Sequence, residues 1–165
     1  MRRAIFPGSF DPPTNGHLDI ISRSQPLFDE IIIAVLNNPD KHPLFSVEER
    51  CDMIREILPS VQNGGCKVTV DSFSGLTADF ARRSGATAIV RGIRAVSDYE
   101  YELRMALMNR RLEPTIETVF LMADEEFSYV SSTLMKQVFM LGGRVAGLIP
   151  ELVENRMREK LNKSK

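Results

Sequence analysis

The sequence predicts an α/β fold, a Rossmann-like sheet of five parallel strands flanked by helices. Two observations predict it. Short apolar runs rich in β-branched residues alternate with amphipathic stretches, and this rhythm repeats five times over 165 residues. No linker, internal repeat or low-complexity segment interrupts it. We therefore expect a single domain over residues 1–165, with right-handed crossovers between the strands and a frayed tail over about residues 160–165.

Three strands and three helices are expected in the first half of the chain. The strands are apolar runs that end at turn residues: Arg3 to Phe6, Glu30 to Leu36 and Lys67 to Phe73. The helices run from Gly16 to just before Pro26, from Ser46 to about Leu58, and from Thr77 to Ser84. Ser46 and Glu49 have the spacing of a capping box, and Gly85 is suited to the turn that ends a helix.

The second half repeats the pattern. Its expected strands are Ala88 to Val90 and Glu117 to Ala123. Three helices are expected. The first begins at a capping box formed by Ser97 and Glu100 and ends near Leu112. The second runs from Ser131 or Ser132 to about Leu141, and the third from Pro150 to about Leu161. The complete order of elements is that of a doubly wound sheet, in which ligands bind outside the carboxyl ends of the strands.

Composition removes several classes of function. There are 21 Lys and Arg residues against 22 Asp and Glu, a formal charge of -1, which disfavours a nucleic-acid partner. No apolar run is long enough to span a membrane, and the Pro7-Gly8 turn comes too early for a signal peptide. Cys51 and Cys66 are too few for a disulfide framework and lack the spacing of a zinc site. We expect a cytoplasmic protein without a metal site of its own.

Polar residues suited to bind anions follow the first predicted strand. Gly8 allows a ligand to approach the backbone, and Ser9 adds a hydroxyl. Thr14 or Asn15 is suited to cap the next helix, which puts His17 in its first turn, where free amides attract anions. There His17 can donate a hydrogen bond to a phosphate, but it is a poor general base because the helix dipole disfavours its protonation. The alternative is that His17 is a surface residue beside the cap.

Two further strand ends carry suitable groups. Arg91 and Arg94 flank a glycine after the fourth strand, and paired guanidinium groups suit phosphates. Pairing of these arginines with the acidic residues of the next helix is an equal alternative. After the fifth strand, the hydroxyls of Ser131, Ser132 and Thr133 are either helix caps or, with free amides, a cradle for phosphates.

Three sequence strings together resemble the phosphopantetheine adenylyltransferase family of nucleotidyltransferases. GSFDPPTNGH, from Gly8 to His17, is similar to the family's form of the HxGH signature, with threonine first. RGIRAVSDYEYE, from Arg91 to Glu102, is close to its RGLRxxxDFEYE segment, and the stretch SSTLMK resembles its ISSSxVK stretch. The matched loops occur in the family's order from Arg3 to about Leu161, which implies the nucleotidyltransferase type of the fold.

The resemblance assigns roles residue by residue. His17 would stabilise the transition state, with Lys41 and Arg91 also in the catalytic set; Lys41 read alone is a solvated loop residue. The residues that would bind ATP are Ser9, Phe10, His17, Gly92, Ile93, Arg94, Glu102, Phe127, Ser128, Tyr129, Val130, Ser131, Ser132 and Thr133. Those that would bind the acceptor are Ser9, Lys41, Thr77 and Arg91. Some relatives carry Trp in place of Phe127, which keeps the position aromatic.

The implied reaction transfers the adenylyl group of ATP to 4'-phosphopantetheine, giving dephospho-coenzyme A and pyrophosphate. Mg²⁺ would enter with ATP, bound by its phosphates and water. The resemblance also implies a homohexamer and feedback by coenzyme A. Two alternatives remain: a nucleotidyltransferase of this fold acting on nicotinate mononucleotide or a polyol phosphate, and a nucleotide-binding module without catalysis.

Overall fold

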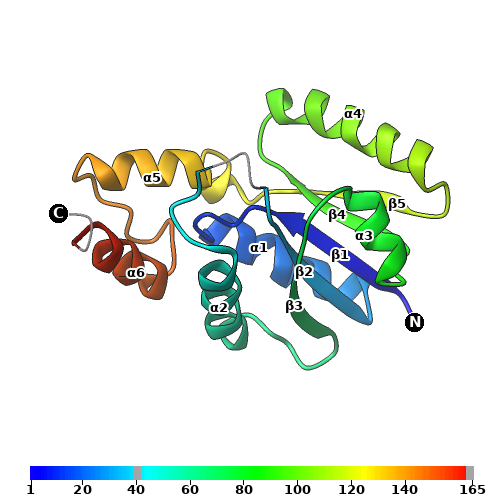
Figure 1. Cartoon of the computed structure of the whole chain (residues 1–165), viewed down its shortest axis with the longest axis horizontal. Helices are drawn as coiled ribbons and strands as arrows, with labels where there is room; N and C mark the ends of the chain where they lie inside the picture. The colour runs from blue at the N-terminus through cyan, green and yellow to red at the C-terminus, as the bar shows by residue number, and fades with distance from the viewer. Residues whose placement is uncertain (39–41, 163–165) are drawn as a thin grey trace.

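The computed structural model describes residues 1–38 and 42–162. Its centre is one parallel sheet with the strand order β3-β2-β1-β4-β5, flanked by helices on both faces (Figure 1). The strands are β1 (Arg3–Gly8), β2 (Glu30–Leu36), β3 (Lys67–Phe73), β4 (Ala88–Ile93) and β5 (Glu117–Met122). The predicted α/β class with five parallel strands is therefore confirmed.

The helices divide between the two faces of the sheet and one end of the molecule. They are α1 (Asn15–Ser24), α2 (Val47–Ile57), α3 (Thr77–Arg83), α4 (Val96–Leu112), α5 (Ser132–Met140) and α6 (Glu151–Asn162). Ile20 of α1 and Ile54 of α2 pack in one core with Ile33 of the sheet, and Phe80 of α3 packs on the other face with Ile89. Helices α5 and α6 pack together beside α2, at the end away from the N-terminus (Figure 1).

Most predicted helix ends agree with the structure. Thr14 caps α1, and Ser131 rather than Ser132 caps α5. Pro26 and Pro59 lie in the short 3-10 turns η1 (Gln25–Leu27) and η2 (Leu58–Ser60), which follow α1 and α2 directly. A third such turn is η3 (Glu125–Phe127). Helix α6 runs to Asn162, into the stretch for which the sequence predicts a frayed tail; residues 163–165 lie outside the described part.

The predicted capping box of α4 is wrong. Ala95 is the N-cap residue and makes no side-chain cap, so Ser97 already lies within the first helical turn. The cause is Asp98, whose Oδ2 atom accepts a hydrogen bond from the main-chain N–H of Arg94 at 3.3 Å. This contact turns the chain into the helix two residues earlier than the serine pattern indicates. Among the described helices, none is long and apolar enough to cross a membrane.

The sheet is split between β1 and β4. Strand β1 pairs with β2 through six positions, from Arg3 with Glu30 to Gly8 with Val35, but with β4 only through Ala4 and Ile5. Pro7 explains where this pairing stops, because proline has no N–H to donate to a neighbouring strand. The predicted first strand ends at Phe6, whereas β1 continues along β2 to Gly8. The crevice at the reversal of strand order is the usual ligand position in such sheets.

Candidate active site

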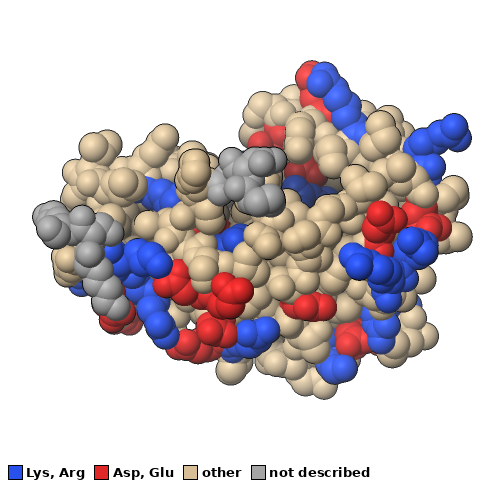
Figure 2. All heavy atoms as spheres, in the orientation of Figure 1, with Lys and Arg blue, Asp and Glu red and all other residues tan. Residues whose placement is uncertain are grey.

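Two cavities open at this split. The larger, of about 420 Å³, lies among β1, α1, α4 and the loop before α5. The smaller, of about 310 Å³, extends toward the ends of β2 and β3. The residues that line both are Pro7, Gly8, Ser9, Arg91, Tyr101 and Glu102. Figure 2 shows the surface notched between the parts of the molecule formed by α4 and α5.

The first loop is shaped by Gly8 and Phe10. A Cβ atom on Gly8 would lie only 3.0 Å from the Phe10 ring, so the loop is folded tightly on itself. Phe10 has a φ of 49°, and the residue is 2% exposed. Its ring packs against the imidazole of His17, with 4.8 Å between the ring centroids and 60° between the planes. Phe10 therefore helps to hold His17 in place through its side chain.

Within residues 1–38 and 42–162, one ring nitrogen of His17, Nε2, has no hydrogen-bond partner. It is the third residue of α1 and forms a capping box with Thr14, whose main-chain N–H donates to His17 Nδ1 at 3.0 Å. Because Nδ1 accepts this bond, the hydrogen of the neutral ring resides on Nε2. Burial, followed by the positive charges of Arg94 and Arg91, lowers the pKa of His17 from 6.5 to about 4. The ring at neutral pH is thus an uncharged hydrogen-bond donor.

Arg91 connects β4 to β1 across the split. Its Nη1 atom donates to the carbonyl oxygen of Pro7, and its Nε and Nη2 atoms bind the carboxylate of Glu102 in a two-pronged pair, the Nε contact being 2.7 Å. These contacts use three of the five N–H groups of a guanidinium. Among the described residues, two N–H groups therefore remain for a ligand in the shared part of the two cavities.

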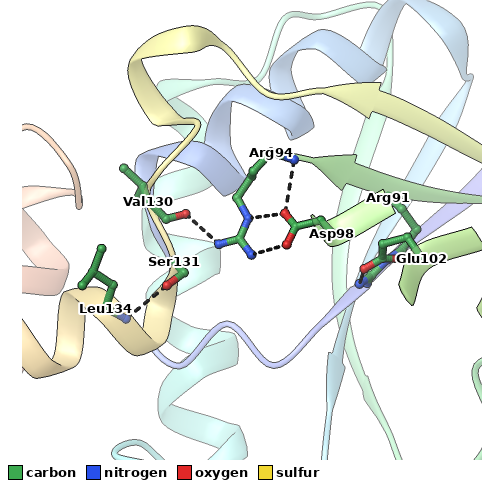
Figure 3. A network of polar contacts seen from close by, with 7 residues as sticks. All are labelled: Arg91, Arg94, Asp98, Glu102, Val130, Ser131 and Leu134. Atoms are coloured by element: carbon green, nitrogen blue, oxygen red, sulfur yellow. Dashed lines mark hydrogen bonds and ion pairs between the residues drawn. The ribbon is translucent and has the colours of Figure 1, made fainter. Parts of the chain in front are cut away.

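Arg94 joins β4 to the loop before α5 (Figure 3). Its guanidinium pairs with Asp98 through Nε at 2.9 Å, and Nη1 donates to the carbonyl oxygen of Val130 at 3.1 Å. Both arginines thus lie at the cavity and pair with acidic residues of α4. The two alternatives that the sequence leaves open for these arginines are therefore compatible.

The start of α5 faces the larger cavity. Ser131 caps the helix by accepting the N–H of Leu134 at 3.1 Å, which Figure 3 also draws. Ser132 Oγ donates to the carbonyl oxygen of Pro12 at 2.7 Å, which fastens the helix to the first loop. Both hydroxyls therefore have partners within the chain, and a ligand phosphate would meet the free amides of the first helical turn.

The structure gathers most of the predicted site residues. Those that line the larger cavity are Ser9, Phe10, His17, Arg91, Gly92, Arg94, Glu102, Phe127, Val130, Ser131 and Ser132. Thr77 lines the smaller cavity with Ser9 and Arg91. The predicted residues found in the lining of neither cavity are Ile93, Ser128, Tyr129 and Thr133. Lys41 lies outside the described residues.

Residues 5–138 match the model of the cytidylyltransferase-like family. A phosphopantetheine adenylyltransferase of Carboxydothermus hydrogenoformans is 52% identical over 163 residues, covering 99% of this chain and 98% of its own. One from Alkaliphilus oremlandii is 55% identical over 150 residues, covering 91% and 93%. This chain belongs to the phosphopantetheine adenylyltransferase family.

Similarity of fold extends beyond this family. The Plasmodium falciparum nicotinic acid mononucleotide adenylyltransferase complexed with NaAD superposes with a TM-score of 0.71, covering 98% of this chain and 96% of its own. At 15% sequence identity, this neighbour shows a common fold only.

Three charged residues next to the candidate site have no role in the sequence prediction. They are Asp11, Arg50 and Lys136, of which the first two are 5% and 3% exposed. The sequence could have pointed to Asp11, because this residue lies within the GSFDPPTNGH string. It could not have pointed to Arg50, because Arg50 contacts main-chain carbonyl groups, which every residue carries.

Proposed function

We propose that the protein transfers the adenylyl group of ATP to 4'-phosphopantetheine, forming dephospho-coenzyme A and pyrophosphate. One observation carries the proposal: two cavities share Ser9 and Arg91 in their lining, and His17 lines the larger one. Two substrates bound from opposite sides would bring their phosphates together there. The relatives at 52% and 55% identity support 4'-phosphopantetheine as the acceptor.

The larger cavity would hold ATP and the smaller one the pantetheine arm. Arg94 and the first turn of α5 border the larger cavity, where they would bind the nucleotide's phosphates. Thr77 and the apolar side chains of Phe73 and Met105 line the smaller one, which suits an extended, uncharged arm. The acceptor phosphate would lie against Ser9 and Arg91, and the family resemblance adds Lys41.

Catalysis would then rest on positioning and on stabilisation of charge. The acceptor phosphate is already an anionic nucleophile at neutral pH, so the reaction needs no general base. Arg91 would hold this phosphate in line with the α-phosphate of ATP. His17 would donate from Nε2 to the α-phosphate as negative charge builds there. Its pKa of about 4 keeps the ring neutral at pH 7, which suits a hydrogen-bond donor in a reaction that needs no general base.

Mg²⁺ would enter the site with ATP. The described residues contain no group of three or more His, Cys, Asp or Glu residues that could hold a metal ion. The carboxylates among the described residues lining the larger cavity, Asp98 and Glu102, are paired with arginines. These residues fit an ion that is carried by the nucleotide's phosphates, where it would neutralise charge on the leaving pyrophosphate.

A panel of acceptors tests the reaction. Pyrophosphate release from ATP is measured with 4'-phosphopantetheine, nicotinate mononucleotide, a polyol phosphate and no acceptor. Release that depends on 4'-phosphopantetheine alone is expected. Release with another acceptor reassigns the substrate, and ATP binding without release from any acceptor supports a nucleotide-binding module without catalysis.

Substitution of His17 tests its role within this reaction. We expect His17→Ala to lower kcat about 100-fold or more, because a donor to the developing charge is lost. The Kd for ATP, measured by calorimetry, should change by less than about threefold. Equal kcat values in the variant and the wild type would remove His17 from the mechanism.

We further propose that the protein is a homohexamer and works in the cytoplasm under feedback by coenzyme A. Helix α4 supports self-association, because it exposes apolar side chains such as Leu107 at 56% and Met108 at 54%.

Two buried free thiols, Cys51 and Cys66, fit a reducing compartment. Coenzyme A contains both the nucleotide and the pantetheine arm, so it would compete for both cavities. Inhibition competitive with each substrate is the expected result.

A further inference from the structure

Arg50 of α2 is a buried cation bound to main-chain carbonyl groups. It is 3% exposed. Its Nη1 atom donates to the carbonyl oxygens of Ser9 at 2.6 Å and Leu36 at 3.0 Å. Its Nε atom donates to those of Phe45 and Ser46, both at 3.2 Å. One planar group therefore connects the loop after β1, the end of β2 and the turn that leads into α2.

Asp11 holds the same turn from the other side. Its carboxylate accepts the main-chain N–H groups of Leu44 and Phe45, both at 2.9 Å, and the Lys136 ammonium of α5 at 2.7 Å. Residues 44–46 are thus fixed through their N–H groups by Asp11 and through their carbonyl groups by Arg50. Both charged side chains bind main-chain atoms, so these contacts do not require particular side chains at residues 44–46.

We call the contacts of Asp11 and Arg50 to residues 44–46 the bracket; it reaches the candidate site through Ser9. Ser9, whose carbonyl oxygen Arg50 binds, lines both cavities. Neither Asp11 nor Arg50 is among the described residues that line either cavity, so neither is positioned to touch a substrate. Burying a charge is costly unless it is well bonded, and an apolar side chain could fill the same space. An apolar side chain could not, however, donate directional hydrogen bonds to three backbone segments at once.

We propose that Arg50 and Asp11 are positioning residues for adenylyl transfer, which set the place of Ser9 and hence of the acceptor phosphate. The proposal rests on the proposed function. In-line attack depends steeply on geometry, and a shift of about 1 Å in a reacting group can lower the rate about 100-fold. Loss of the bracket should therefore impair use of the acceptor more than use of ATP.

Steady-state kinetics on the full-length protein test this. In Arg50→Lys, which keeps the charge but not the fork, we expect the KM for 4'-phosphopantetheine to rise at least about tenfold and kcat to fall by a similar factor. The KM for ATP should stay within about twofold of the wild-type value. Arg55→Lys is the matched control, because Arg55 lies on the same helix with an exposed guanidinium paired to Asp52, and its constants should match the wild type.

Asp11→Asn weakens the contacts to the N–H groups of the same turn, and it remains informative if Arg50→Lys folds poorly. It should show the same split between the two KM values. Because both residues act through one turn, their effects in the double variant should be less than additive. A fall in kcat with both KM values unchanged would indicate only a smaller folded fraction and would overturn the proposal.

Amide hydrogen exchange on the ligand-free protein provides a readout that does not depend on the reaction. In Arg50→Lys the amides of Phe10, Leu44 and Phe45 should exchange faster, while those of β3 stay as in the wild type. Unchanged exchange at these three amides overturns the positioning role. If exchange changes but the wild type releases no pyrophosphate with 4'-phosphopantetheine, the proposed function fails and the bracket stands as an observed property of the fold.

Discussion

The protonation state of His17 is set by the N-cap residue of α1 and by two arginines at the cavity. Thr14 fixes which nitrogen carries the hydrogen, and the arginines at the cavity disfavour a second proton. The sequence predicts the position in the first turn and the neutral state, but it attributes the latter to the helix dipole. In the structure, burial is the larger cause, followed by Arg94 and Arg91. Burial depends on tertiary packing, which the local sequence does not contain.

Stability should depend on pH through this residue. The folded pKa of about 4 lies below the ordinary 6.5, so on acidification the unfolded chain takes up this proton first. The free energy of unfolding should therefore fall as pH drops from 6.5 toward 4, by at most about 1.5 kcal/mol between pH 6.5 and pH 5. Urea unfolding of wild type and His17→Gln across this range measures the effect. The difference between the two proteins should change with pH, and parallel curves would contradict the assignment.

Arg91 has a structural role alongside its proposed binding role. Its partner Glu102 has a side chain only 11% exposed, so removal of the arginine leaves a buried carboxylate unpaired. Arg91→Ala should thus cost about 3 kcal/mol of stability and also raise the KM for 4'-phosphopantetheine.

The double variant Arg91→Ala with Glu102→Gln separates the two roles of Arg91. It should recover much of the lost stability, because the unpaired charge is gone, but not the use of the acceptor. Thermal unfolding and kinetics on the same preparations give both quantities. Recovery of the KM together with the stability would show that Arg91 serves the fold alone.

At the scale of elements, capping residues are predictable where their partners are close in sequence. Ser46 and Glu49 form the predicted box, with Glu49 Oε2 accepting the Ser46 N–H at 2.7 Å. Ser97 and Glu100 have the same spacing but form none, because Asp98 binds Arg94 instead. The contact of Asp98 with Arg94 is as local in sequence as the expected box of Ser97 and Glu100, so a spacing rule cannot choose between the two caps.

The two serines therefore provide a matched pair of variants. Ser46→Ala should lower the free energy of unfolding by about 1 kcal/mol, because the cap of α2 is lost. Ser97→Ala should change it by less than about 0.5 kcal/mol, since alanine suits a helical position without a cap. Chemical denaturation of the two variants measures both values. Equal losses would mean that Ser97 caps α4 in solution.

Element boundaries at the site are less predictable than the elements themselves. The apolar runs and turns identify all five strands, yet β4 includes Arg91 and Gly92, which the sequence places after the end of the strand. The apolar run stops at Val90, so the pattern gives no sign that the strand continues. Strand β5 keeps them in the sheet, with Arg91 opposite Phe120. Such pairing joins residues far apart in the chain and is not encoded in either segment alone.

At the scale of the whole molecule, the near-neutral charge extends into the cleft itself. Asp98 and Glu102 lie in the cleft, each paired with an arginine. Figure 2 shows both signs interspersed over the face in view. If the cleft binds small phosphates as proposed, recognition would depend on directed N–H groups more than on a broad positive field.

Helix α4 should be the surface through which copies associate. Leu107→Glu with Met108→Glu places two charges on its apolar face and should shift the protein to smaller species in sedimentation velocity. Leu27→Glu is the control, because Leu27 is 43% exposed in η1, before β2, and its assembly should match the wild type. A wild-type monomer, or an assembly unaffected by the double change, would exclude α4 as the interface.

The split beside Pro7 has one more consequence. A pocket made by movable side chains must be opened by its ligand, and the work of opening lowers affinity. Here the opening follows from covalent structure: the ring nitrogen of Pro7 has no hydrogen, and its carbonyl oxygen is bound by Arg91 rather than by a strand. The crevice is thus already present before any substrate arrives. A substrate bound here would therefore spend none of its binding free energy on separating the two strands.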